Sequence, residues 1–275
     1  MGELDGKVAI VTGAGRGIGE QVARKLAANG ANVVVADVDA DVARGVAADL
    51  ETEGTTYIGD LTRPGACDEL VQTAIDAFGK LDIVVNNAGY AWDGPIHKVT
   101  DEQFQAMLDI HTVVPFRVLR AAAPHLREPA KKEREEGREV FRKVVNVTSL
   151  AGIMGNAGQV AYAAGKGGLV GLTRALAKEW GGLKININCV AFGFIETRLT
   201  APVGTAGEVK AGDKSITLGV SEQVRSMIGG AIPLGRAGTA EEAARGVYFL
   251  CSPASDYVHG QVLAVSGGLA VGMAG

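Results

Sequence analysis

The chain has 275 residues, of which 47% are hydrophobic and 21% are charged. This composition excludes a disordered protein, and the length is sufficient for a hydrophobic core that needs neither disulfides nor a metal ion. The 27 basic and 31 acidic residues give a net charge of −4, which argues against a nucleic-acid-binding protein that acts through bulk charge. We expect no membrane-spanning helix, because no run of about 18 apolar residues occurs.

The three cysteines, Cys67, Cys189 and Cys251, are widely separated and form no CxxC motif. This spacing argues against a disulfide framework or a zinc ribbon and favours a reducing compartment. The first residues show no basic segment followed by an apolar one, so we expect no secretory signal and a cytoplasmic location. No metal site is predicted, because the histidines at positions 97, 125 and 259 have no metal-binding spacing.

Short apolar runs alternate with helical patterns along most of the chain. In chain order the predicted strands are 7–11, 31–36, 56–59, 81–85, 143–148, 185–191 and 262–265. The predicted helices are a stretch ending at residue 29, then 42–53, 64–78, 101–126, 161–180 and 240–250. Strands that are apolar throughout indicate a parallel sheet covered on both faces. We therefore predict one α/β domain over residues 1–275, a Rossmann-type doubly wound parallel sheet with helices on both faces.

Two segments interrupt this alternation. Residues 127–143 contain seven basic and five acidic residues, which predicts a charged insertion. It is either a solvated helix or loop or, as an alternative, a partner-binding segment. Residues 197–230 are rich in Gly, Thr and Ser and look irregular. Because they follow the sixth strand at the expected ligand-binding edge of the sheet, we predict that they form a substrate lid.

The segment Thr12-Gly-Ala-Gly-Arg-Gly-Ile-Gly19 lies between the first strand and the first helix. Such a turn predicts a dinucleotide site: Gly13 permits the tight turn, Gly17 lets the backbone approach a pyrophosphate, and Gly19 allows close packing of helix and strand. The start of the helix then offers free N–H groups to the phosphates.

Asp37 follows the second strand, 18 residues after Gly19. A carboxylate there accepts hydrogen bonds from the adenosine ribose and repels a 2′-phosphate, which favours NAD over NADP. Arg16 instead favours NADP, since a guanidinium near the ribose can bind a phosphate. We give Asp37 the greater weight, because a carboxylate beside a phosphate is a direct like-charge repulsion.

Tyr162 and Lys166 are four residues apart and so share one face of a helix. A nearby ammonium lowers the pKa of a phenol, which would let Tyr162 exchange a proton with an alcohol or carbonyl oxygen near neutral pH. Ser149, at the end of the fifth strand, can hydrogen-bond the same oxygen. Asn86 to Gly89 end the fourth strand at the same edge.

In this order and spacing, the glycine turn, Asp60-Leu61, Asn-Asn-Ala-Gly89, Ser149 and Tyr162 with Lys166 resemble the short-chain dehydrogenase/reductase superfamily. The resemblance covers nearly the whole chain. Residues 152–168 and 194–197 are most similar to its 3-oxoacyl-[acyl-carrier-protein] reductase branch. The resemblance implies hydride transfer between a nicotinamide cofactor and a secondary alcohol or ketone, and a homotetramer.

The resemblance also implies residue roles. Tyr162 is the general acid and base, Lys166 lowers its pKa and holds the nicotinamide ribose, and Ser149 polarises the substrate carbonyl. Asp60 contacts the adenine amino group, and Ile195 and Thr197 contact the carboxamide. The full set implied for the cofactor is Gly13, Arg16, Gly17, Ile18, Gly19, Asp37, Asp60, Leu61, Asn87, Ala88, Gly89, Tyr162, Lys166, Ile195 and Thr197.

Two positions depart from the family pattern. His111 stands where the family has an asparagine that helps hold a water in a proton relay. His111 is either a substitute relay, which predicts an ionisation between about pH 6 and 8, or a packed residue. Phe192 replaces the usual proline after the sixth strand, where it either stacks near the nicotinamide or packs in the core.

The substrate is the least determined feature. The branch implies a 3-oxoacyl or 3-hydroxyacyl thioester, whereas the long predicted lid favours a bulky steroid- or terpenoid-like alcohol. A non-catalytic NAD-binding regulator is a further alternative, because a fold alone does not establish activity. Trp92, after the Asn-Asn-Ala-Gly segment, either lines the substrate pocket or packs in the core or at an interface.

Overall fold

The computed structural model describes residues 2–205, 207–211 and 214–270. Its main sheet has seven parallel strands in the order β3-β2-β1-β4-β5-β6-β9. The strands are β1 (Val8–Thr12), β2 (Asn32–Asp37), β3 (Gly54–Ile58), β4 (Ile83–Asn86), β5 (Arg142–Ser149), β6 (Ile185–Phe192) and β9 (Val262–Val265). The chain order reverses between β1 and β4, which is the switch point where such sheets bind ligands.

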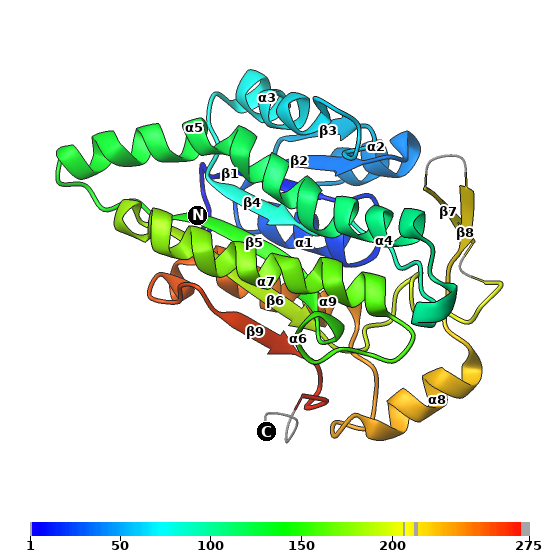
Figure 1. The fold of residues 1–275 in the computed structure, drawn as a ribbon. Helices are drawn as coiled ribbons and strands as arrows, with labels where there is room; N and C mark the ends of the chain where they lie inside the picture. Colours follow the sequence, from blue (N-terminus) through cyan, green and yellow to red (C-terminus); the bar gives the residue numbers. More distant parts are fainter. Residues whose placement is uncertain (1, 206, 212–213, 271–275) are drawn as a thin grey trace.

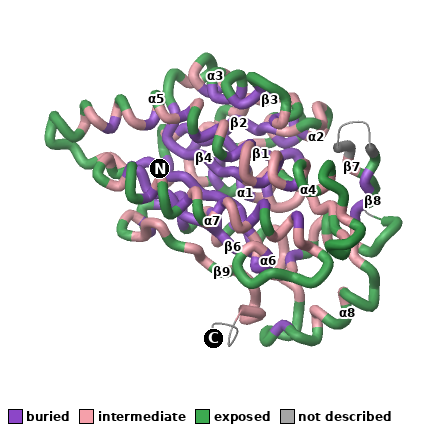
Figure 2. Tube along the Cα trace, in the orientation of Figure 1, coloured by how far each residue is buried: buried purple, intermediate pink, exposed green. Residues whose placement is uncertain are grey.

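Helices cover both faces of this sheet (Figure 1). One apolar cluster joins it to α3 (Ala66–Phe78), α5 (Val114–Glu135) and α7 (Val160–Trp180). A second cluster, on the opposite face, joins it to α1 (Gly17–Ala27), α2 (Ala40–Ala48) and α9 (Ala240–Cys251). The central strands are therefore buried between two helical layers, as the apolar sequence runs predicted (Figure 2). The structure confirms the Rossmann-type α/β fold.

The long helical pattern predicted over 101–126 is divided into three parts. Helix α4 (Asp101–Leu108) begins at a capping box in which the Thr100 and Gln103 side chains bond each other's backbone N–H groups. A π-helical turn, η2 (Asp109–Val113), follows, and α5 then runs to Glu135. The predicted helix over 42–53 was too long, because α2 ends at Ala48 and β3 already begins at Gly54.

The charged segment 127–143, predicted as an insertion, is continuous with two regular elements of the fold. Its first nine residues are the last turns of α5, and Arg142 and Lys143 begin strand β5. Both side chains are buried and paired: Arg142 with Glu133 at 2.6 Å, and Lys143 with Asp256 at 2.6 Å. The charge density therefore reflects internal ion pairs as well as solvated positions.

The segment 197–230 is more regular than its composition suggested. It contains the antiparallel strands β7 (Glu208–Ala211) and β8 (Lys214–Thr217) and helix α8 (Glu222–Ala231), capped by Ser221. In Figure 1 this hairpin and α8 lie beyond the carboxyl ends of the main strands. The short helix α6 (Ala151–Met154) was also not predicted.

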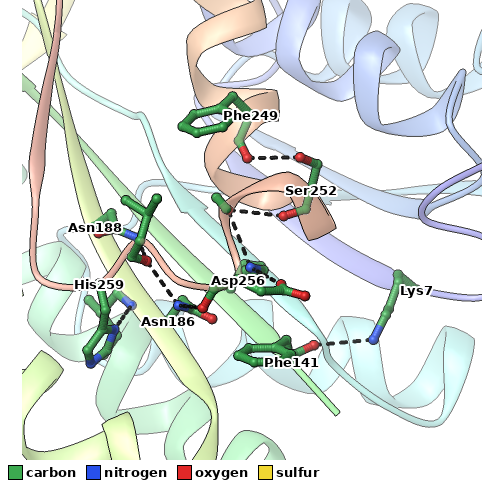
Figure 3. A network of polar contacts seen from close by, with 12 residues as sticks. Lys7, Phe141, Asn186, Asn188, Phe249, Ser252, Asp256 and His259 are labelled. Atoms are coloured by element: carbon green, nitrogen blue, oxygen red, sulfur yellow. Dashed lines mark hydrogen bonds and ion pairs between the residues drawn. The ribbon is translucent and has the colours of Figure 1, made fainter. Parts of the chain in front are cut away.

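A network of polar side chains lies near the amino ends of β6 and β9, at the opposite end of the strands from their carboxyl ends (Figure 3). The His259 imidazole accepts a hydrogen bond from the Ile187 N–H at 3.2 Å and donates one to the Ala177 carbonyl at 2.6 Å. The Asn186 and Asn188 amides both donate to the Val258 carbonyl at 2.9 Å. His259 is therefore a structural residue that extends the β6–β9 pairing, as its lack of metal spacing indicated.

Across the described ranges, no helix is long and apolar enough to cross a membrane. The same residues contain no group of three metal-binding side chains, and Cys67, Cys189 and Cys251 are buried free thiols.

Candidate active site

The predicted site residues gather at one edge of the main sheet. Strands β1 to β6 are parallel and adjacent, so the segments that leave their carboxyl ends meet at this edge. These segments carry the glycine turn, Asp37, Asp60, residues 87–89, Ser149 and residues 192–197. Sequence positions that lie more than 180 residues apart are thereby brought into one region.

The glycine turn is shaped by close backbone approaches. Gly13 has φ 64°, and a Cβ on it would lie 2.8 Å from the Ala88 Cα. A Cβ on Gly19 would lie 2.1 Å from the Gly13 carbonyl oxygen, so α1 can pack here only with glycine. Among the described residues no side chain caps the start of α1 at Arg16. Its first N–H groups are thus available to an anion, and the turn fits a dinucleotide pyrophosphate.

Asn87 connects the end of β4 to this turn. Its side-chain amide donates to the Thr12 carbonyl at 2.9 Å and to the Gly13 carbonyl at 3.1 Å. The Thr12 hydroxyl in turn accepts the Ala88 N–H at 3.0 Å. Asn87 therefore holds the glycine turn in shape, a contribution that the resemblance did not imply.

At the end of β2, the Asp37 carboxylate accepts the Gly15 N–H at 2.9 Å and the Asp39 N–H at 3.1 Å. The Asp37 carboxylate thus lies against the glycine turn. Arg16 forms an ion pair with Asp39 at 2.5 Å, and this contact lowers the pKa of the Asp39 carboxyl. The positive charge of Arg16 beside the glycine turn is therefore balanced by the negative charge of Asp39.

Asp60 and Leu61 follow β3. The Asp60 carboxylate accepts the Thr62 N–H at 2.8 Å and the Thr62 hydroxyl at 2.7 Å, which fixes the turn. Leu61 is buried in the apolar cluster beneath it. The adenine contacts that the resemblance implies for this pair remain predictions.

Ser149 and Tyr162 meet where β5 and α7 converge. Ser149 is the last residue of β5, and its hydroxyl accepts the Ala151 N–H at 3.2 Å. Burial raises the pKa of the Tyr162 phenol to about 12, although a hydrogen bond with Ser149 lowers it. Asp93 is a further cause and raises the Tyr162 pKa. The two hydroxyls are therefore placed to bind one substrate oxygen.

Lys166 lies one helical turn after Tyr162 and is buried. Its ammonium donates to the Val147 carbonyl at 2.7 Å and lies 5.8 Å from the centre of the Tyr162 ring. Burial lowers the Lys166 pKa to about 8. Burial, Ser149 and Asp93 shift the Tyr162 pKa here, and Lys166 is not among these causes. Its implied effect on the phenol stays a prediction.

His111 projects from the π-helical turn η2 into this cluster. Its Nε2 lies 2.7 Å from the Tyr90 carbonyl oxygen, to which it must donate, and its ring meets the Tyr162 ring edge-on at 5.0 Å. Its Nδ1 is buried and has no hydrogen-bond partner among the described residues. A Cβ on Gly89 would lie 2.3 Å from the imidazole, so Gly89 makes room for the ring.

Burial and the charge of Lys166 lower the pKa of His111 well below its usual value. This direction favours a neutral imidazole and disfavours the predicted His111 ionisation between about pH 6 and 8, which stays a prediction for the pH–rate profile. The prediction used the pKa of a solvated imidazole, whereas this one is 1% exposed. A neutral relay and a packing role both agree with this geometry.

The segment after β6 is anchored to the sheet. Phe192 is buried in the apolar cluster of α1 and α9, and its carbonyl accepts the Leu150 N–H at 2.9 Å. Of the two alternatives predicted for Phe192, the structure shows the one in which it packs in the core. The Ile195 side chain is buried in the same cluster. Thr197 lies over the glycine turn, with its methyl group 3.8 Å from the position of a Cβ on Gly17.

Two residues of this region were missed from the sequence. Gln159, just before α7, donates its side-chain amide to the Asp93 carboxylate at 2.6 Å. Asp93 follows the Asn-Asn-Ala-Gly segment by four residues, and this place in the chain was the available signal. Trp92, which precedes Asp93 in the chain, is partly buried and packs against the core, as one of its alternatives predicted.

The fold and this cluster define the class of protein: an α/β oxidoreductase with a dinucleotide cradle beside a Ser, Tyr and Lys group. Residues 13–270 match the family model described as enoyl-(acyl carrier protein) reductase. The chain belongs to the short-chain dehydrogenase/reductase family, and it is an NAD(P)-dependent oxidoreductase that acts on CH–OH groups.

Curated relatives align along nearly their whole length. The chain is 33% identical over 271 residues to a 3-oxoacyl-[acyl-carrier-protein] reductase FabG of Chlamydia muridarum, covering 97% of this chain and 98% of the relative. It is 34% identical over 266 residues to the protein of that name from Escherichia coli K12, with coverages of 97% and 98%. It is 35% identical over 271 residues to nodulation protein G of Rhizobium sp. N33, with coverages of 98% and 100%.

Proposed function

We propose that the protein transfers a hydride between NAD(H) and a secondary alcohol or ketone, and that this substrate is a 3-oxoacyl or 3-hydroxyacyl thioester. The observation that carries the chemistry is the convergence of Ser149, at the end of β5, with Tyr162 on α7, one helical turn from the buried Lys166 ammonium. The names of the aligned reductases support the thioester.

In this proposal Tyr162 is the catalytic acid and base. Its hydroxyl donates a proton to the carbonyl oxygen during reduction and recovers it during oxidation. Ser149 donates a hydrogen bond to the same oxygen and orients the carbonyl. The nicotinamide, when bound, supplies or accepts the hydride. Lys166 holds the ribose and replenishes the proton, and His111 presents its free Nδ1 lone pair beside this group.

We propose that the cofactor is held by the residues that the resemblance implied. Gly13, Arg16, Gly17, Ile18 and Gly19 would face the pyrophosphate, and Asp37 the adenosine ribose. Asp60, Leu61, Asn87, Ala88 and Gly89 would line the adenosine side, and Ile195 and Thr197 the nicotinamide side. The missing space for a Cβ at Gly13 and Gly19 and the uncapped start of α1 support this assignment.

The proposed preference for NAD rests on charge. The Asp37 carboxylate lies against the turn and would repel a 2′-phosphate, and Arg16, the nearby cation, is already paired with Asp39. A 2′-phosphate would therefore be repelled by Asp37 and would have to compete with Asp39 for the Arg16 guanidinium.

A bulky apolar alcohol is a second candidate substrate. It is favoured by exposed apolar side chains in segment 197–230: Leu199, Val203, Val224 and Met227. These side chains suit a large hydrophobic substrate that α8 covers. We retain the thioester as the first candidate, because an acyl chain is also apolar and the aligned relatives carry that name.

The location and the oligomeric state of the protein are also proposals. We propose a cytoplasmic homotetramer formed from one domain over 1–275. The partly exposed edge strand β9 supports an interface at the end of the chain. We propose that residues 262–275, which are apolar and rich in glycine, form this interface; residues 271–275 lie outside the part of the chain that the structure describes.

A substrate panel tests the proposed function. Thioesters, steroids and simple ketones are assayed with NADH and NADPH by the absorbance of the reduced cofactor. Tyr162→Phe should reduce turnover about 100-fold or more while leaving NAD binding intact. A non-catalytic NAD-binding regulator would instead bind NAD with no turnover across the panel, and a fully active Tyr162→Phe variant would remove the proposed mechanism.

A further inference from the structure

Side-chain contacts in both directions tie the glycine turn to the start of α2. The Asp37 carboxylate accepts the Gly15 N–H at 2.9 Å with one oxygen and the Asp39 N–H at 3.1 Å with the other. The Arg16 guanidinium donates in return to the Asp39 carboxylate at 2.5 Å. The two carboxylates therefore have different partners: Asp37 binds the backbone of the turn, and Asp39 binds its only charged side chain.

Asp39 is held in place by the helix that it begins. It is the N-cap residue of α2, and one of its carboxylate oxygens accepts the Asp41 N–H at 3.3 Å. The other oxygen is the one that binds Arg16. Arg16 is in turn the N-cap residue of α1 and has an extended backbone. The ion pair thus joins the first residues of α1 and α2, and backbone positions at both ends set its geometry.

The turn approaches this corner of the fold as closely as glycine permits. A Cβ on Gly15 would lie 2.9 Å from the Asp37 carboxylate and 2.6 Å from a methyl group of Val42 on α2. The Arg16 side chain, on the next residue, therefore starts beside the end of β2. Its guanidinium and the two carboxylates are the charged groups that meet at this point.

The ion pair between Arg16 and Asp39 is open to solvent, since the two side chains are 44% and 37% exposed. Exposed ion pairs are weak, because water solvates both charges when they separate. A ligand phosphate can therefore displace Asp39 from Arg16. The pair would lower the affinity for such a ligand without excluding it.

We propose that Asp39 is a specificity-determining residue for the cofactor: it occupies the Arg16 guanidinium and so withholds it from a 2′-phosphate on the adenosine ribose. This inference rests on the proposed binding of that ribose beside Asp37. Asp37 would act by repelling the phosphate, whereas Asp39 acts by removing an attraction. Arginine and phosphate form strong charge-assisted hydrogen bonds, and NAD has no phosphate at this position. Asp39 should therefore weaken the binding of NADP and leave that of NAD unchanged.

The test removes the charge of Asp39 and keeps the helix cap. Asp39→Asn and Asp39→Ser both place an uncharged N-cap residue at the start of α2, so the helix should form as in the parent. Arg16→Gln removes the guanidinium, and each Asp39 variant is also made in that background. Asp49→Asn is the matched control, because Asp49 follows the end of α2 and pairs with Arg24 at 3.4 Å. It lies about 15 Å from Asp39 at 1.5 Å per residue.

The dissociation constants of NADP+ and NAD+ are measured by calorimetric titration at about 0.1 M ionic strength, where charges are screened beyond about 10 Å. Asp39→Asn and Asp39→Ser should lower the Kd for NADP+ about five- to tenfold, because the freed guanidinium binds phosphate, and leave the Kd for NAD+ within about twofold. In the Arg16→Gln background they should lower the Kd for NADP+ by about twofold at most, since only direct repulsion is left. Asp49→Asn should change neither constant.

An Asp39→Ser variant that improves NADP+ binding equally in both Arg16 backgrounds would overturn the inference, because its effect would not pass through Arg16. An unchanged Kd for NADP+ in both Asp39 variants would do the same. So would an equal gain in Asp49→Asn, which would reveal a general charge effect. A thermal melt of each protein checks that the fold is retained.

Two smaller probes assign the gain to the 2′-phosphate. The Asp39 variants should gain affinity for 2′,5′-ADP and not for 5′-AMP, and an equal gain for both would contradict the assignment. None of these titrations depends on turnover. If no substrate is converted, the proposed reaction fails while the binding constants still decide the role of Asp39. If the parent binds NADP+ more tightly than NAD+, the proposed preference fails, yet the two Arg16 backgrounds still show whether Asp39 restrains the guanidinium.

Discussion

Gly19 and Gly45 are two glycines inside helices for which the structure forecasts opposite effects of adding one methyl group. At Gly19 the new Cβ would lie 2.1 Å from the Gly13 carbonyl oxygen and 2.5 Å from the Asn87 amide nitrogen. The carbonyl belongs to the glycine turn after β1, and the amide belongs to the residue after β4 that holds this turn, so α1 must move away from both. At Gly45, inside α2, nothing lies within 4 Å of the added Cβ.

Gly19→Ala should lower the free energy of unfolding by about 1–3 kcal/mol, the usual cost of overpacking. It should also raise the Kd for NAD(H) at least about tenfold, which corresponds to about 1.4 kcal/mol. Gly45→Ala should raise the free energy of unfolding by about 0.5–1 kcal/mol, because alanine restricts the unfolded chain and favours helix. Its NAD(H) affinity should be unchanged.

The measurement is urea unfolding of the three proteins, with NAD(H) titrations on each. Equal slopes in denaturant would show that the midpoints report stability alone. The reasoning is refuted if Gly19→Ala unfolds at the midpoint of the parent and binds NAD(H) equally well, or if Gly45→Ala is destabilised.

Three further outcomes are expected. Asp37→Ser combined with Val38→Arg should move the preference toward NADP(H) by about tenfold or more in kcat/KM, and a parent that already prefers NADPH would contradict it. His111→Asn should keep the shape of the pH–rate profile between about pH 6 and 8, because the imidazole is already neutral; loss of an ionisation would disagree. Lys166→Met should abolish most turnover yet raise the unfolding free energy at pH 7 by about 2 kcal/mol.

The sign of the Lys166 effect follows from its pKa of about 8 in the folded protein, below the ordinary value of 10.5. Between these two values the unfolded chain binds more protons than the folded one, so the parent gains stability as the pH rises. The advantage of Lys166→Met should therefore narrow from pH 8 to about 10.5. Unfolding curves at pH 7 and 10 decide this, and a constant difference would contradict it.

The sheet and its site were readable from the sequence because both depend on local patterns. Buried parallel strands appear as continuous apolar runs, and Val262–Val265 was predicted with its exact bounds. The carboxyl ends of parallel strands share one edge, so Ser149, Tyr162 and the glycine turn were placed together without a model of the loops. The pairing of Asn87 with Gly13 was not foreseen, since it depends on the distance between two turns.

Other features depend on tertiary context. Arg142 and Lys143 look like solvated charges in the sequence, and only their partners Glu133 and Asp256 explain their burial. The neutral state of His111 follows from its surroundings and not from its residue type. Segment 197–230 has the composition of a loop, yet a hairpin and α8 form within it.

The π-helical turn at Asp109–Val113 has a consequence for how this chain tolerates deletions. Its Val114 N–H bonds the Asp109 carbonyl five residues back, so the turn holds one residue more than a regular helix. An α-helix advances about 100° per residue, so removing that residue would rotate everything after it by more than a quarter of a circle. The apolar stripe of α5, which includes Val118, Ala122 and Leu126, would then leave the sheet.

The extra residue also sets the rotation of α5 relative to α4, so each of the two helices can turn its apolar face toward its own neighbours. Helix α4, before the turn, packs against α7, and helix α5, after the turn, packs against α3 and the sheet. At the junction, His111 points toward Tyr162 and the Thr112 hydroxyl donates to the Gly165 carbonyl at 2.7 Å. Removal of one residue at this junction would therefore disturb both the packing of α5 and the position of His111 beside Tyr162.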